Sequence, residues 1–214
     1  MGRKTLPKLN PSVDFSRNFR TAELVPRPWD PEALFGRIAP LEIEVGCGKG
    51  LFLRNASAGS PERDFLGIEI AFKYAEFAGY RLAKEGRTNA VMIHGDGQKL
   101  FPEVIPDATA AAVHVYFPDP WWKKRHHRRR VMNETFSKEI ERVLIPGGIL
   151  HFWTDVEEYF DMTVQLLHDN TQLAGPLPVD ERPAEHDLDY RTHFERRMRK
   201  NDLDVFRSEF RKPA

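Results

Sequence analysis

The sequence predicts an α/β fold in which helices cover both faces of a doubly wound, mostly parallel sheet. Between residues 41 and 170, short β-branched and aromatic segments alternate with amphipathic segments of helical period, which is the pattern of βαβ units. A glycine-rich turn follows the first strand-like segment, and an acidic residue lies at the end of each of the first four. Because open α/β sheets bind ligands beyond the carboxyl ends of their strands, we expect a ligand site at that edge.

Length and composition limit the class of protein. The chain has 214 residues, enough for one domain with a substantial core. Its 32 Lys and Arg balance 32 Asp and Glu, so the formal net charge is zero. The charges are nevertheless segregated along the chain: six Lys or Arg fall in 123–130, five in 191–200, and five Asp or Glu in 180–189. Cys47 is the single cysteine, which excludes an internal disulfide. With no apolar leader and no membrane-spanning run, we expect a cytoplasmic protein without membrane or obligate protein partners.

The chain divides into an N-terminal arm and one larger domain. Residues 1–39 are Pro-rich and lack sustained periodicity. We expect an irregular arm that packs in part onto the main body, while a partly disordered tail is an equally simple interpretation. Residues 40–214 form the predicted domain.

The elements of the domain follow from its periodicity. Runs rich in β-branched and aromatic residues predict strands at 41–45, 64–70, 90–96, 110–117 and 148–155. Apolar residues on one helical face predict helices at 51–57, 71–86, 133–144 and 156–169. Gly86 is a predicted C-cap and Asn133 a predicted N-cap. Beyond these, we expect an acidic loop over 171–187, a basic segment of helical tendency over 188–202, and a last strand at the sheet edge within 203–212.

The glycine-rich turn reads EVGCGKG and follows the first strand. Gly46, Gly48 and Gly50 allow positive φ angles and let the backbone approach a ligand closely. A GxGxxG spacing would favour a dinucleotide, whereas this GxGxG spacing, with Glu44 two residues earlier, is typical of S-adenosylmethionine-dependent methyltransferases. That cofactor carries an ammonium group with which a carboxylate can pair. The turn alone is also compatible with a nicotinamide or flavin site.

Two further acids favour the same cofactor. Glu69 ends the second predicted strand, where a carboxylate can accept hydrogen bonds from ribose hydroxyls, although a solvated strand-end charge is the simpler interpretation. Asp96 lies just past the third strand, at the expected position of an adenine edge, and it also fits an ordinary Asp-Gly turn.

Asp119 is the residue that we expect to carry the chemistry. Pro118 and Pro120 stiffen the backbone on both sides of it, and two tryptophans follow. A tryptophan face can stack on a nucleobase, although one of the pair fits a core position equally well. The basic run at 123–130 then offers contacts for phosphates, with Lys123 nearest to the carboxylate. Adjacent histidines without an acid or cysteine at ligand spacing do not predict a metal site.

Over residues 40–212 the chain resembles the bacterial tRNA (guanine-N(7)-)-methyltransferase family. The resemblance rests on FPDPWWKKRHHRRR at 117–130, EVGCGKG at 44–50, GIE at 67–69, GDG at 95–97, WTD at 153–155 and THFE at 192–195. Two departures are Trp122, where the family more commonly has proline, and the lack of a glycine before the last strand.

The resemblance implies a Rossmann-like methyltransferase that transfers a methyl group from S-adenosyl-L-methionine to N(7) of a guanine in the variable loop of tRNA, without a metal. It implies that Glu44, Glu69, Asp96 and Asp119 contact the cofactor. It further implies that the tRNA is contacted by Lys123, Asp155, Thr192, His193, Phe194 and Glu195. From chemistry alone, the Glu195 carboxylate would accept hydrogen bonds from the guanine ring N–H and amino group and so exclude adenine.

Guanine N(7) already carries an in-plane lone pair, so the reaction requires no strong base. We therefore expect Asp119 to position the ring and to stabilise the positive charge that develops on it. A methyltransferase acting on a small molecule or a protein would explain the glycine turn but not the basic run. A non-catalytic RNA-binding module on the same fold would not bind the cofactor, and a nicotinamide oxidoreductase is disfavoured by the GxGxG spacing.

Overall fold

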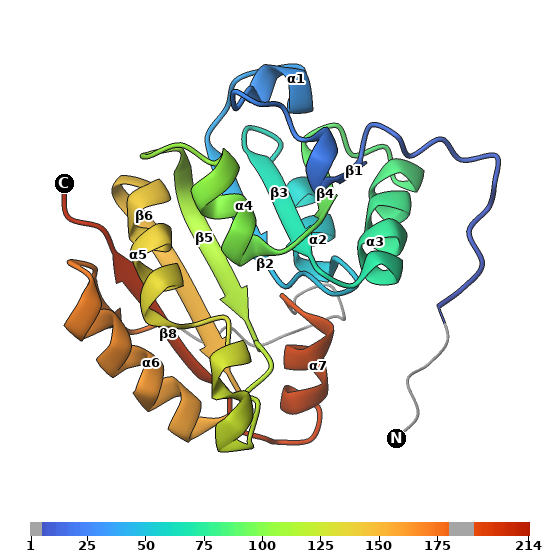
Figure 1. Ribbon diagram of the computed structural model, residues 1–214. Coiled ribbons are helices and arrows are strands. Elements are labelled where there is room, and N and C mark those ends of the chain that lie inside the picture. The colour runs from blue at the N-terminus through green and yellow to red at the C-terminus, as the bar shows by residue number, and fades with distance from the viewer. Residues whose placement is uncertain (1–5, 180–190) are drawn as a thin grey trace.

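A single eight-stranded sheet organises the protein. The structure is a computed structural model that describes residues 6–179 and 191–214 (Figure 1). The strand order is β1-β4-β3-β2-β5-β6-β8-β7, in which β1 to β6 run parallel while β8 is antiparallel to β6 and β7 antiparallel to β8. The strands are β1 (Phe19–Thr21), β2 (Leu41–Val45), β3 (Asp64–Glu69), β4 (Ala90–His94), β5 (Ala110–Tyr116), β6 (Leu144–Thr154), β7 (Ala174–Leu177) and β8 (Phe206–Arg211).

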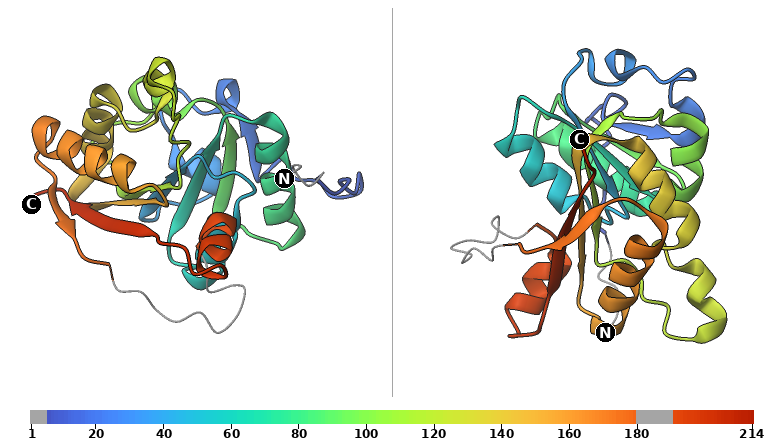
Figure 2. Two further views of the ribbon diagram at one scale, coloured as in Figure 1. Left: turned by 90° about the horizontal axis from the view of Figure 1, so that it is seen from below. Right: turned by 90° about the vertical axis from the view of Figure 1, so that its left-hand side faces the viewer.

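Helices cover both faces of this sheet. They are α1 (Pro31–Phe35), α2 (Leu51–Gly59), α3 (Phe72–Lys84), α4 (Gly97–Val104), α5 (Glu134–Val143), α6 (Glu157–Asn170) and α7 (His193–Arg199), with 3-10 turns η1 (Ala22–Leu24) and η2 (Lys124–Arg129). Figure 2 shows α5 and α6 on one face and α7 on the opposite face. The sheet is therefore doubly wound, as the alternating pattern of the sequence predicts.

Alternation along the strands divides the core between the two faces. One core contains Ile43, Val113 and Phe152 with side chains of α4, α5 and α6, whereas the other contains Phe65 and Trp153 with side chains of α2 and α3. Neighbouring positions on a strand point to opposite faces, so β3, β4, β5 and β6 supply both cores, whereas β2 supplies only the first. The second core is smaller, and its face also carries polar side chains near the glycine turn.

The structure differs from the sequence prediction in three regions of the chain. The arm is not irregular throughout, because Phe19–Thr21 pairs with β4 as an edge strand and 31–35 forms a helix. Helix α4 is absent from the prediction, since Pro102 lies inside it and the preceding Gly-Asp-Gly indicates only a turn. The last strand, β8, lies between β6 and β7 instead of at the edge, because residues 174–177 of the predicted acidic loop form an outer strand.

The carboxyl ends of the parallel strands converge at one end of the molecule. In Figure 1 the arrowheads of β5 and β6 point toward η2 and α7, which lie beyond the strand ends. No helix in the described part of the chain combines the length and apolar character needed to cross a bilayer. The functional residues predicted from the sequence lie at this end of the sheet.

Candidate functional site

The glycine turn forms the floor of a cavity beyond β2. Gly46, Gly48 and Gly50 have φ angles of 81°, 53° and 66°, which other residues rarely adopt. A Cβ atom on Gly46 or Gly48 would meet no protein atom within 4 Å, so open space lies before the backbone there. A Cβ atom on Gly50 would instead lie 2.8 Å from Ala78 Cβ, so this glycine also allows the turn to pack against α3. The turn is thus shaped both for a ligand and for helix packing.

Glu44 is a buried carboxylate that lines this cavity. Its side chain is only 3% exposed, and its Oε2 atom has no hydrogen-bond partner in the described part of the protein. Burial, together with the nearby charge of Glu69, raises the pKa of Glu44 to about 8. A buried acceptor without a donor is costly, so this oxygen indicates a place for a cationic or hydrogen-bond-donating ligand.

Glu69 and Asp96 both have structural partners as well as a place at the sheet edge. Glu69 Oε2 accepts the Gly48 N–H at 2.8 Å, and Oε1 accepts the Ala71 N–H at 2.8 Å, which ties the glycine turn to the end of β3. Asp96 Oδ1 accepts the Gln98 N–H at 3.0 Å and caps α4. Each carboxylate oxygen has two lone pairs, so these bonds leave acceptor capacity for a ligand.

The Pro-Asp-Pro turn continues β5 beyond the sheet and holds Asp119 in solvent. Phe117 and Trp121, on either side of the turn, have φ angles of 49° and 45°. Such conformations are costly for residues with a Cβ atom, and surrounding contacts must hold them. Arg130 supplies one contact, since its Nε donates to Pro120 O at 2.7 Å. Asp119 itself is exposed, which leaves its carboxylate accessible to a substrate.

The basic run forms η2 and folds back over one of the tryptophans. Arg129 lies above the Trp121 ring at 5.0 Å, and the His126 ring meets its edge at 5.8 Å. Trp122 is 69% exposed, and Lys123 is exposed as well. The run therefore presents cationic side chains and an open indole face beside Asp119, which is a surface suited to single-stranded nucleic acid.

Helix α7 covers the cavity from the opposite side. Thr192 and Phe194 line it together with Glu44 and the glycine turn, and its volume is about 180 Å³. Phe194 packs on Phe117 with ring centroids 5.0 Å apart. The structure thus brings the THFE segment next to the glycine turn, although the two are far apart in the chain. The backbone of His193 begins α7, whereas its side chain lies outside the described residues.

Glu195 is buried and has a structural role in α7. It is 3% exposed; its Oε2 accepts the Arg191 N–H, and its Oε1 lies 3.3 Å from Arg199 Nη1. Its own N–H donates to Thr192 Oγ1 at 3.0 Å. Thr192 thus caps α7, and Glu195 accepts the N–H of the residue before the cap. The arrangement is close to a capping box, in which the Glu would accept the N–H of the capping Thr itself. The carboxylate that the sequence suggests for reading guanine is thus engaged inside the protein.

Arg191 is a site residue that no pattern in the sequence indicates. Its Nη1 donates to Tyr116 Oη at 2.8 Å, and its guanidinium lies 5.1 Å from the centre of the Trp153 ring. Tyr116 also bonds His114 Nδ1, whose other ring nitrogen lies 2.8 Å from Glu42. The network joins three strands to the segment that precedes Thr192 and so fixes that segment over the cavity.

The structure places the remaining predicted residues at the same edge but apart from the cavity. Asp119, Lys123 and Asp155 follow β5 and β6 and do not line it, and Asp155 is partly exposed. Cys47 lines it, but burial raises the pKa of its thiol well above the usual range, so it remains protonated. The site thus has an enclosed part around Glu44 and an open part around Asp119.

The donor set fits S-adenosylmethionine. The partnerless oxygen of Glu44 suits the ammonium group of its amino-acid portion, the open space before Gly46 and Gly48 admits the ligand beside the backbone, and Glu69 retains acceptor capacity for hydroxyls. In the described part of the chain, no three His, Cys, Asp or Glu side chains are arranged to hold a metal ion.

Comparison with known proteins identifies the family. A family model described as a putative methyltransferase matches residues 38–208. A tRNA (guanine-N(7)-)-methyltransferase of Rhodopirellula baltica is 48% identical, over 99% of this chain and 80% of its own length. Another, from Alcanivorax borkumensis, is 36% identical over 86% of this chain and 77% of its own length.

Solved structures support the fold. A structure described as an antibiotic related methyltransferase has a TM-score of 0.62 at 13% identity and covers 86% of this chain and 92% of its own. A 30S ribosomal A1408 methyltransferase from an uncultured bacterium has a TM-score of 0.54 at 18% identity, over 84% of this chain and 91% of its own. The chain belongs to the tRNA (guanine-N(7)-)-methyltransferase family and has the fold of S-adenosylmethionine-dependent methyltransferases.

Proposed function

We propose that this protein transfers a methyl group from S-adenosylmethionine to N(7) of a guanine in tRNA, giving 7-methylguanosine. One observation carries the proposal beyond family membership: the cavity that Thr192 and Phe194 line also contains the glycine turn and the buried Glu44, whose Oε2 atom has no hydrogen-bond partner among the described residues. A cofactor site and a segment implicated in tRNA contact therefore meet within reach of the exposed Asp119 turn. Since tRNA is the substrate, we place the protein in the cytoplasm.

The cofactor contacts follow from the polar groups of the enclosed part. When bound, S-adenosylmethionine supplies a methyl group made electrophilic by a sulfonium. Glu44 pairs with the ammonium group in this proposal, which satisfies the oxygen that has no partner in the protein as described. Glu69 accepts hydrogen bonds from the ribose hydroxyls, and Asp96 lies near the adenine edge. Gly46 and Gly48 let the ligand lie against the backbone, while Gly50 completes the turn by packing against α3.

Asp119 acts on the guanine and does not abstract a proton. Attack by N(7) leaves positive charge on the purine ring, and a carboxylate held next to the ring stabilises that charge. The turn suits this role because two prolines and the Arg130 bond to Pro120 O restrict its motion. Rigid placement lets the carboxylate bring the ring into line with the methyl group and reduces the entropic barrier.

The exposed groups around Asp119 hold the RNA. Lys123 and the arginines of η2 contact phosphates, and Trp122 offers a face for an unstacked base. Asp155, Thr192, His193 and Phe194 remain our candidates for contacts to the guanine or its ribose. For Glu195 we propose that its carboxylate contributes by holding Thr192 and Phe194 in place, because both of its oxygens already have partners.

The direct test is to incubate the protein with bulk tRNA and S-adenosylmethionine labelled on its methyl group, then digest the RNA and identify the labelled nucleoside. We expect label in 7-methylguanosine. Label in another nucleoside would contradict the choice of base but not the choice of cofactor. If calorimetry detects cofactor binding but no label enters RNA, a different class of substrate must be sought.

A further inference from the structure

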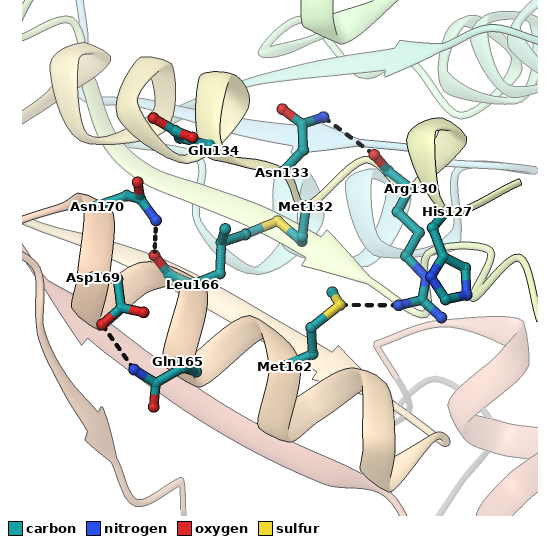
Figure 3. A pocket seen from close by; sticks show the side chains of 10 residues that line it. All are labelled: His127, Arg130, Met132, Asn133, Glu134, Met162, Gln165, Leu166, Asp169 and Asn170. Atoms are coloured by element: carbon teal, nitrogen blue, oxygen red, sulfur yellow. Dashed lines mark hydrogen bonds between the residues drawn. The ribbon is translucent and has the colours of Figure 1, made fainter. Parts of the chain in front are cut away.

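A groove lies on the opposite face of the sheet from the cofactor cavity. It runs between α6 and the segment that joins η2 to α5, and its volume is about 460 Å³ (Figure 3). Met132, Met162 and Leu166 form an apolar floor, while Gln165 and Asp169 lie on the exposed rim along α6. Neither the predicted cofactor contacts nor the predicted tRNA contacts include any of these residues, so the groove is unexplained by the proposed function.

The lining suits one flat heteroaromatic ring with polar edges. Methionine side chains are flexible and polarizable, so they adapt to the face of a ring. The Gln165 amide and the Asp169 carboxylate, hydrogen-bonded to each other at 2.7 Å, offer donors and acceptors at the rim. Proteins recognise unstacked bases of RNA by this combination of face contact and hydrogen bonds to base edges.

The charge at one end of the groove indicates an anion. Arg130 lines the groove and is only 5% exposed, and it forms no ion pair with any residue that the structure describes. Its guanidinium contacts the Tyr159 ring at 4.9 Å and Met162 Sδ at 2.9 Å, neither of which carries charge. Buried charges are normally paired, so a phosphate next to Arg130 would supply the missing partner. Two acidic residues at the other end of the groove would repel a phosphate only weakly. Glu134 is paired with Lys138 at 2.7 Å, and the charge of Asp169 is exposed to solvent.

Arg130 also links the groove to the Asp119 turn. The same side chain that lines the groove donates from Nε to Pro120 O at 2.7 Å. A ligand phosphate on the guanidinium would restrict Arg130 and with it the turn that carries Asp119. A phosphate in the groove would therefore lie one side chain away from the turn that carries Asp119.

We propose that this groove binds one unpaired nucleotide of the substrate RNA other than the methylated guanine, with its phosphate on Arg130 and its base on the floor formed by Met132, Met162 and Leu166. The inference rests on the proposed function, since it names a second contact of the same substrate. It makes recognition depend on two nucleotides held on the two sides of the Asp119 turn.

A double-mutant cycle between protein and RNA tests the proposal. The RNA is a tRNA transcript in which one unpaired nucleotide at a time, excluding the target guanine, is replaced by an abasic residue. For the unmodified protein we expect one such replacement to lower kcat/KM roughly tenfold, the loss typical of one base contact. In Gln165→Trp the indole fills the groove, so kcat/KM for the intact transcript falls by a similar factor and the abasic replacement has no further effect.

Two further variants make the result interpretable. His168→Trp places the same side chain on the same helix at a position that is 80% exposed and does not line the groove, and it must retain the behaviour of the unmodified protein. Gln165→Ala removes only the amide and should lower kcat/KM by a smaller factor. Calorimetry of cofactor binding verifies that each variant is folded.

Either of two results would overturn the inference. One is that no abasic position other than the target affects kcat/KM; the other is that the effect is equal in Gln165→Trp and the unmodified protein. Both leave the proposed function intact, because the intact transcript still yields 7-methylguanosine. Failure of the intact transcript to be methylated at N(7) would instead contradict the proposed function itself.

Discussion

Replacing Glu44 by glutamine should stabilise the cofactor-free protein while abolishing cofactor binding. Burial and the charge of Glu69 raise the pKa of Glu44 to about 8, so the folded protein holds a proton there at neutral pH. In the unfolded chain the same carboxyl titrates near its ordinary value of 4.5. Between these two values the folded state binds one proton more than the unfolded state, so stability must fall as pH rises. A glutamine amide does not titrate in this range, so the variant does not lose stability through this position as the pH rises.

The size of the effect follows from the two pKa values. The stability difference between variant and unmodified protein should grow by about 1.4 kcal/mol per pH unit between pH 5 and pH 8, to about 5 kcal/mol above pH 8. Between pH 5.5 and 7.5 it should increase by roughly 3 kcal/mol, which for a protein of this length corresponds to roughly 6–12 °C in Tm. The other titratable groups contribute equally to the pH dependence of both proteins, so their contributions cancel when the two unfolding free energies are subtracted.

The assay is urea or thermal unfolding of both proteins over this pH range, with and without S-adenosylmethionine. Glu42→Gln is the matched control, since Glu42 lies on the same strand and the same face. Burial works to raise its pKa, but the hydrogen bond and charge of His114 and the charge of Arg63 lower it below the ordinary value. Glu42 is therefore ionised in both the folded and the unfolded protein over pH 5.5–7.5. The Glu42→Gln variant should accordingly be less stable than the unmodified protein by an amount that does not change over this range. A pH-independent difference for Glu44→Gln would refute the reasoning, because it would mean that Glu44 is ionised in the folded protein.

Three further results are expected. Asp119→Ala should lower kcat at least about 100-fold, the loss typical of one transition-state contact, with tRNA affinity little changed in a filter-binding assay; full activity would contradict its role. Arg191→Ala should lower kcat/KM for tRNA about tenfold without changing cofactor affinity, and Arg191→Lys should restore it only in part, because lysine lacks the planar fork that bonds Tyr116 and stacks on an indole. Replacing Arg128 and Arg129 by glutamine should weaken tRNA binding and reduce the slope of log affinity against log salt by about 1 per lost phosphate contact; an unchanged slope would place the phosphates elsewhere.

Local patterns predict the parallel part of the fold and the glycine turn that lines the cavity. Strands β2 to β6 are predictable because a strand buried on both faces gives a short β-branched run, and the glycine turn because ligand approach requires positive φ angles. Helix α4 is not predicted, because a proline inside a short segment normally indicates that no helix continues through it. The strand in the arm and the strand at 174–177 escape it because three or four residues are too few to show alternation.

The tRNA half is harder to predict because its contacts join distant parts of the chain. Arg191 bonds Tyr116, which lies 75 residues earlier, and no local pattern indicates that pairing. The role of Glu195 is different, since Thr-x-x-Glu before a helix is a signature of a capping box and is visible in the sequence. Its position within a motif that resembles the family favours a contact with guanine, whereas the burial of its carboxylate cannot be known from the sequence.

Two buried side chains, each with one interaction left unmatched by the described residues, lie on opposite sides of the Asp119 turn. Glu44 has an Oε2 atom without a hydrogen-bond donor, which suits a cationic group. Arg130 hydrogen-bonds Pro120 O and Met162 Sδ but forms no ion pair with a described residue, so its charge suits an anionic group. Both reduce the stability of the free protein, because a buried acceptor without a donor and a buried charge without a counter-ion are costly. Natural sequences keep such residues mainly where a ligand completes them. The pair therefore favours two ligands of opposite local charge, one on each side of the turn that carries Asp119.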